Sequence, residues 1–169
     1  MGDFSDMLSK IPLLQGLEGA EFEQMARRFS VENYPAGSTI LEQGYGGLKL
    51  YVLVEGKTRI FRTLNGSRVV ITTLEPPETF GEVSILDGDP ASATVEAESD
   101  VVVLTLGRDE FYDLMNASPE LASKVYRNLL RTLCQRLRTT TNQVQDYFAI
   151  NKALCENESF RSFYKLFCS

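Results

Sequence analysis

The chain has 169 residues, of which 43% are hydrophobic and 24% are charged, so it is long enough to bury the core of one domain with an appendage. Its net charge of −6 disfavours nonspecific nucleic-acid binding, because that affinity comes mainly from lysines and arginines that neutralise phosphates. The chain has no histidine, and neither a Gly-x-Ser-x-Gly nor a Gly-x-x-x-x-Gly-Lys motif, so we do not expect an enzyme.

Neither a membrane helix nor a secretory signal is predicted. No window approaches the ~18 or more uninterrupted apolar residues that a membrane helix needs, and the first residues lack a basic region followed by an apolar run. Cys134, Cys155 and Cys168 are widely spaced, and no histidine is present to complete a zinc site. We therefore expect a cytoplasmic protein with reduced thiols, no bound metal and no membrane contact.

The first part of the chain has a helical pattern, which then changes to a strand pattern. Apolar residues recur at helical spacing between Phe4 and Phe29, with interruptions at Pro12 and Gly16, which predicts two short helices. From Val31 the chain consists of short runs rich in β-branched and aromatic residues, bounded by Gly, Pro and Asn at intervals of roughly eight to twelve residues. This rhythm predicts a β-sandwich or a roll.

Five strands are defined most clearly. They are predicted over Lys49–Glu55, Lys57–Leu64, Arg68–Leu74, Ala93–Ala97 and Asp100–Leu106. Asn65-Gly66 joins the second strand to the third, and Asn-Gly between alternating apolar runs predicts a hairpin, because a type I′ turn needs positive φ at both central residues.

The helical period returns after Gly107. A helix is predicted over Asp109–Met115, followed by a long helix that begins at Ser118-Pro119, with Ser as the N-cap and Pro at the first helical position. One face of the long helix has a heptad spacing, formed by Tyr126, Leu130, Leu133, Leu137, Thr140, Val144 and Tyr147. This seam predicts a homodimer formed by two such helices. The alternative is that the same stripe covers the sheet of its own chain.

The end of the chain is aromatic. Phe160, Phe163, Tyr164 and Phe167 recur at helical spacing within the segment Asn157–Phe167. We expect an amphipathic helix that closes on the core, with partner binding as the alternative. The expected organisation is N-terminal helices with a β-roll over residues 1–117, the long helix over 118–148 and a helical tail over 149–169.

One segment, Phe80–Val95, reads FGEVSILDGDPASATV and is called the cassette below. Together with Tyr34–Gly37, Glu42–Gly44 and the hairpin Gly56, it resembles the cyclic nucleotide-binding domain family, and the resemblance extends roughly from Ile11 to Tyr147. It implies a mainly β member of the α+β class, of the catabolite-activator type. The implied fold is an antiparallel double-stranded β-helix, or jelly roll, with short N-terminal helices, a cassette turn and helix, and a long dimerisation helix. The implied ligand is cyclic AMP or cyclic GMP.

The resemblance also implies the roles of cassette residues. Glu82 matches the glutamate that accepts the ribose 2′-hydroxyl, Gly81 the backbone that approaches the sugar, and Ser92 the hydroxyl beside the phosphate. The remaining expected ligand contacts in the cassette are Phe80, Val83, Ala91 and Ala93. Residue 91 is where the family places an arginine, and here it is alanine.

Loss of the cassette arginine predicts weak or altered ligand binding. A bidentate arginine–phosphate contact contributes about 3 kcal/mol, which corresponds to about a hundredfold in affinity. The first candidates to supply the missing positive charge are Arg127 and Arg131 on the long helix. Further candidates are Lys49, Arg59 and Arg62 on strands. The alternative function is a degenerate, ligand-free domain that acts in dimerisation or protein interaction.

The segment Leu137–Thr141 resembles the part of the catabolite-activator branch in which Thr and Ser hydroxyls read the adenine across the dimer. Thr140 and Thr141 are the matching residues, although a polar seam position that only determines helix register explains them equally well. That branch continues into a helix-turn-helix, whereas only Phe148–Ser169 follows here. We therefore expect no direct binding to nucleic acid, and an unknown protein as the partner.

Overall fold

The computed structural model describes residues 8, 10–46 and 48–157, with only the backbone for residues 154 and 155. The chain divides into two compact units between Leu129 and Leu130. The elements in chain order are η1 (Pro12–Leu14), α2 (Ala20–Ala26), β1 (Ser30–Tyr34), β2 (Thr39–Leu41), β3 (Lys49–Glu55), β4 (Thr58–Leu64), β5 (Ser67–Leu74), β6 (Glu78–Phe80), α3 (Glu82–Asp87), β7 (Thr94–Ala97), β8 (Val101–Gly107), α4 (Arg108–Ala117) and α5 (Pro119–Glu156).

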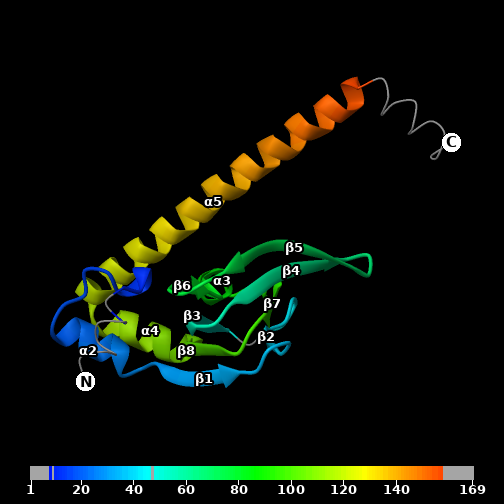
Figure 1. The fold of residues 1–169 in the computed structure, drawn as a ribbon. Coiled ribbons are helices and arrows are strands. Elements are labelled where there is room, and N and C mark those ends of the chain that lie inside the picture. Colours follow the sequence, from blue (N-terminus) through cyan, green and yellow to red (C-terminus); the bar gives the residue numbers. More distant parts are fainter. Residues whose placement is uncertain (1–7, 9, 47, 158–169) are drawn as a thin grey trace. The chain divides into compact units, whose positions relative to one another are not determined.

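The strands form two four-stranded antiparallel sheets, which confirms the predicted roll (Figure 1). The strand order is β1-β8-β3-β6 in one sheet and β2-β7-β4-β5 in the other. Buried residues from both sheets form one cluster between them, called the interior cluster. Its members are Ile40, Leu41, Tyr51, Leu53, Leu74, Phe80, Ala91, Val95, Ala97, Val101 and Val103.

Strand β3 is apolar on both faces because both faces are covered. Tyr51 and Leu53 belong to the interior cluster, whereas Leu50 and Val52 pack with the helices, in a second cluster that includes Met25. Alternate side chains of a strand point to opposite faces, so a strand between two cores reads as a continuous apolar run. This explains the sequence KLYVLVE, whose predicted range is the range of β3.

The hairpin between β4 and β5 is the one that the sequence predicts. Asn65 has φ of 50° and Gly66 has φ of 79°, as a type I′ turn requires. Leu64 pairs with Ser67 across the turn, and β4 pairs with β5 along its whole length, with one register shift after Ile60.

The start of α5 also confirms its prediction. The Ser118 hydroxyl oxygen accepts the N–H of Leu121 at 3.4 Å, which is an N-cap interaction. The first turns of α5 then bury Leu121, Val125 and Leu129 in the second cluster, the one that includes Met25 and Leu50.

Of the predicted N-terminal helical region Phe4–Phe29, the structure describes residue 8 and residues 10–29. Within residues 10–29, Pro12–Leu14 forms a 3-10 turn and Ala20–Ala26 forms an α-helix. Gly16 and Gly19 both have positive φ, so the helical pattern is interrupted by turns between these two elements. Most of the predicted aromatic tail helix, Asn157–Phe167, lies outside the described residues.

Glu32 on β1 is the centre of a polar cluster. Its Oε1 accepts hydrogen bonds from Lys49 Nζ at 2.8 Å and from the Thr105 hydroxyl at 3.0 Å, and its Oε2 accepts one from the Tyr34 hydroxyl at 2.6 Å. Burial acts to raise the pKa of Glu32, but the three donors outweigh burial and lower it. Burial and the bond to Glu32 raise the pKa of Tyr34.

We expect Glu32→Gln to reduce the free energy of unfolding by about 1–2 kcal/mol at pH 7, because the donors lose a charged acceptor. The folded-state pKa of Glu32 is lowered, so its contribution is present above the unfolded pKa of about 4.3 and is lost as the pH falls through the folded value. Urea unfolding of both proteins at pH 7 and near pH 3.5 measures this. The difference between the two proteins should shrink in acid, and a constant difference would contradict the assignment.

Candidate functional site

The cassette begins where β6 ends. Phe80 is buried and stacks on Tyr51 of β3, with ring centroids 4.8 Å apart. Gly81 follows with φ of 79°, and a Cβ there would collide with the carbonyl oxygen of Lys49. Glycine is therefore required at residue 81 both by its backbone conformation and by the close approach of β3. Burial raises the pKa of Tyr51 to about 12, so its hydroxyl stays neutral at physiological pH.

The short helix α3 turns Glu82 inward. Glu82 is only 2% exposed, whereas acidic side chains are rarely buried unless they are paired. Val83, the next residue, is 42% exposed. The Tyr112 hydroxyl of α4 donates to the carbonyl oxygens of Ile85 at 3.1 Å and Leu86 at 3.3 Å, which ties the end of α3 to α4.

Ala91 packs into the interior cluster and is 4% exposed. Its N–H donates to the carbonyl of Tyr45 at 3.0 Å, and its carbonyl accepts the N–H of Gly44 at 2.8 Å. The predicted turn Glu42–Gly44 is thus held against the cassette at residue 91. Ser92 is exposed and Ala93 is half-buried. The cassette therefore has the expected shape but no charge at the position of the family arginine.

The fold brings one basic residue to the cassette that sequence reasoning missed. A Cβ on Gly88, at the end of α3, would lie 2.8 Å from Nη1 of Arg108, whose guanidinium also lies 5.4 Å from the centroid of the Tyr112 ring. Arg108 is thus at the opposite end of α3 from Gly81. No local pattern indicates this, because the contact depends on how α4 packs against α3.

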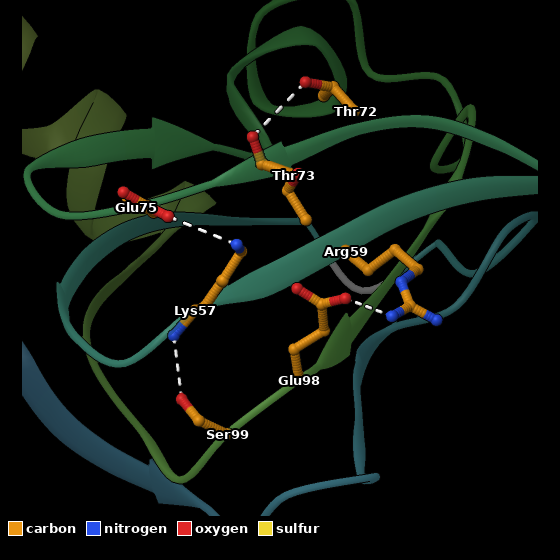
Figure 2. Close-up of polar contacts among 7 residues, drawn as sticks. All are labelled: Lys57, Arg59, Thr72, Thr73, Glu75, Glu98 and Ser99. Atoms are coloured by element: carbon orange, nitrogen blue, oxygen red, sulfur yellow. Dashed lines mark hydrogen bonds and ion pairs between the residues drawn. The ribbon is translucent and has the colours of Figure 1, made fainter.

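Two of the three strand cations considered as replacements are paired with carboxylates. Arg59 forms an ion pair with Glu98 (Figure 2). Figure 2 also shows Lys57, which pairs with Glu75 at 3.3 Å. Lys49, on strand β3 of the other sheet, pairs with Glu32 of β1 in that same sheet. Arg62 is exposed.

The candidate residues of α5 are divided between the two units. Arg127 is exposed in the first unit, and Arg131, Thr140 and Thr141 are exposed in the second. The Thr141 hydroxyl donates to the carbonyl of Leu137 at 2.8 Å, one turn earlier in the same helix. The ligand-binding roles of these residues stay predictions.

The predicted seam is partly exposed. Leu130, Leu137, Val144 and Tyr147 are exposed, and Tyr126 and Leu133 are half-buried. The Tyr126 ring lies 6.0 Å from that of Phe111, so this end of the seam packs against the core of the first unit. Dimerisation through the seam also stays a prediction.

Comparison with known proteins identifies the family of the chain. The family model of the cyclic nucleotide-binding domain matches residues 31–118, which include both sheets and the whole cassette. The chain belongs to the cyclic nucleotide-binding domain family. The domain is 38% identical over 128 residues to a cyclic AMP receptor protein of Thermus thermophilus, with 75% of this chain and 57% of the relative covered.

Two further relatives have the same domain. A CRP-like cAMP-activated global transcriptional regulator of Mycobacterium tuberculosis is 28% identical over 142 residues, with 83% of this chain and 62% of the relative covered. The crystal structure of a catabolite activator protein of Thermus thermophilus superposes with a TM-score of 0.71 and 34% identity, covering 85% of this chain and 65% of that one. The chain spans about 60% of the length of the two curated relatives, 62% and 57% respectively.

Within the part of the chain that the structure describes, no helix has both the length and the apolar character needed to cross a membrane. The same residues contain no group of three or more His, Cys, Asp or Glu side chains arranged to hold a metal ion.

Proposed function

We propose that this protein is a regulatory sensor module of the cyclic nucleotide-binding type, with weakened or altered ligand preference. The observation that carries the proposal is the cassette itself, in which Gly81 and a buried Glu82 are retained while residue 91 is a buried, uncharged alanine. The ligand is cyclic AMP or cyclic GMP, bound weakly, and the module acts in the cytoplasm without catalysis.

Each cassette residue has a role in this proposal. Glu82 accepts a hydrogen bond from the ribose 2′-hydroxyl, and Gly81 lets the sugar approach the backbone. Ser92 donates its hydroxyl to the phosphate. Phe80, Val83, Ala91 and Ala93 surround the ligand. Thr140 and Thr141 contribute to base recognition in a dimer.

The output of the module is a homodimer that binds a protein partner. Support comes from the exposed apolar side chains of Leu130, Leu137 and Val144, which recur every seven residues on α5. Large apolar side chains at one heptad position on an exposed helix indicate a facing helix. No direct contact with nucleic acid is proposed.

Calorimetric titration with cyclic AMP and cyclic GMP at low salt tests this function. We expect binding in the range of about 0.1–1 mM, since loss of the arginine weakens a micromolar site by about a hundredfold. Glu82→Ala should weaken that binding by a further tenfold or so, because a charge-assisted hydrogen bond contributes about 1.5–3 kcal/mol. Unchanged affinity in the Glu82 variant would exclude the ribose role.

A ligand-free interaction module is the second candidate. It is favoured by the position of Ala91, whose side chain contributes to the interior cluster together with Phe80 and Val95. If the interior is already filled, no ligand fits there, and the fold would retain the cassette only because it needs this turn. A titration without heat up to millimolar nucleotide, for a protein purified free of ligand, would support this second candidate.

A further inference from the structure

The basic side chains around strands β3 to β5 are paired with carboxylates at every position but one. The pairs are Lys49–Glu32, Lys57–Glu75, Arg59–Glu98 and Arg68–Glu96. Arg62 on β4 is exposed and forms no ion pair with any residue that the structure describes. Its guanidinium therefore keeps its N–H donors for water or for a ligand.

Arg62 lies on the face of β4 that lines the interior of the roll. β4 pairs with β7 without a bulge, so its side chains alternate regularly between the two faces. Ile60 packs on the interior cluster, to which its partner Val95 belongs. Arg59, the residue before Ile60, points to the opposite face by the same alternation and forms its ion pair with Glu98. Arg62 follows Ile60 by two residues and thus shares its inward face.

The strand register brings Arg62 to the phosphate end of the cassette. Phe61 and Thr94 are the last partners of β4 and β7. Arg62 follows Phe61 on β4, and Ala93 immediately precedes the first residue of β7. Directly opposite residues of antiparallel strands, such as Phe61 and Thr94, have Cα atoms about 4.5–5.5 Å apart, so the chain segments on which Arg62 and Ala93 follow are adjacent at this point. A long arginine side chain that begins beside this pair can extend toward Ser92 and Ala93, the residues beside which the proposed function places the phosphate.

The neighbour of Arg62 on the other side is apolar. Val69 is its partner on β5 and is 47% exposed. Directly opposite residues of two antiparallel strands share a face, so an apolar side chain lies beside the guanidinium. A ligand with an anionic phosphate and a flat apolar ring matches this combination.

We propose that Arg62 binds the ligand phosphate in place of the arginine that is absent at residue 91. This inference rests on the proposed function, since it concerns the charge at the same site. It assigns the compensating cation to a strand, in preference to Arg127 and Arg131 of α5.

The test compares Arg62→Gln with Arg59→Gln, which removes the same charge from the same strand on the opposite face. Each full-length protein is titrated with cyclic AMP and with adenosine, which lacks the phosphate, after its folding has been checked by circular dichroism. We expect Arg62→Gln to weaken cyclic AMP binding about tenfold or more and to leave adenosine binding unchanged. Arg59→Gln should change neither.

The outcomes separate this inference from the function on which it rests. If the unchanged protein binds cyclic AMP and Arg62→Gln binds it equally well, the inference is wrong and the function stands, with Arg127→Gln and Arg131→Gln as the next variants. Equal losses for cyclic AMP and adenosine would also overturn it, because they would indicate a structural role. If only an Ala91→Arg variant binds cyclic AMP, the site is intact but Arg62 does not supply the charge. If neither the unchanged protein nor the Ala91→Arg variant binds cyclic AMP, the proposed function fails.

Discussion

Replacing Ala91 by arginine is expected to raise the affinity for cyclic AMP by up to about a hundredfold. A planar guanidinium forms two parallel, charge-assisted hydrogen bonds with a phosphate, which together contribute about 3 kcal/mol. Residue 91 follows the loop after α3 and precedes the exposed Ser92, so the new side chain begins beside the proposed phosphate position. Calorimetry on the Ala91→Arg protein and the unchanged protein, in the same low-salt buffer, measures the change.

Pro90→Arg is the matched control, because it adds the same charge one residue earlier at an exposed position. A similar gain in the control would indicate a general effect of charge on an acidic protein. No gain in a folded Ala91→Arg protein would mean that the interior is filled, as in a ligand-free module. The gain should be larger in the Arg62→Gln background than in the otherwise unchanged chain, because two cations that contact one phosphate are coupled.

Leu137→Asp is expected to convert the proposed dimer into monomers. Leu137 is 68% exposed on α5, and in the proposed seam it faces the same residue of the partner helix. The substitution would bury two like charges at the interface, and an unpaired buried charge costs several kcal/mol. Sedimentation velocity at several protein concentrations measures the result.

Gln135→Asp provides the control for this variant, since Gln135 is exposed on α5 outside the heptad seam. It adds the same charge to the same helix and should leave the dimer unchanged. If Leu137→Asp remains dimeric, the interface lies elsewhere on the chain. If both variants dissociate, the cause is the net charge of the helix and not its seam.

Much of the fold follows from local chemistry. The range of β3 is predicted from its apolar run, and the positive φ values of Asn65 and Gly66 follow from the residue types that tolerate them. The start of α5 follows from Ser118 and Pro119, because one caps a helix and the other suits its first turn. The cassette is identified through its resemblance to the family, and the match over residues 31–118 confirms that family.

Which charged side chains around the site are paired could not be predicted from the sequence alone. The sequence by itself determined five of the eight described strands, the hairpin, the start of the long helix and the loss of the arginine at residue 91, since each depends on residues close together in the chain. Only the tertiary structure decided which cations are available: Arg59 is paired with Glu98, Arg108 lies beside Gly88, and Arg62 is exposed one position beyond the last pair of β4 and β7. Those contacts join residues far apart in sequence. They depend on how β4 pairs with the distant strand β7 and on how α4 packs against α3, which the order of neighbouring residues does not determine.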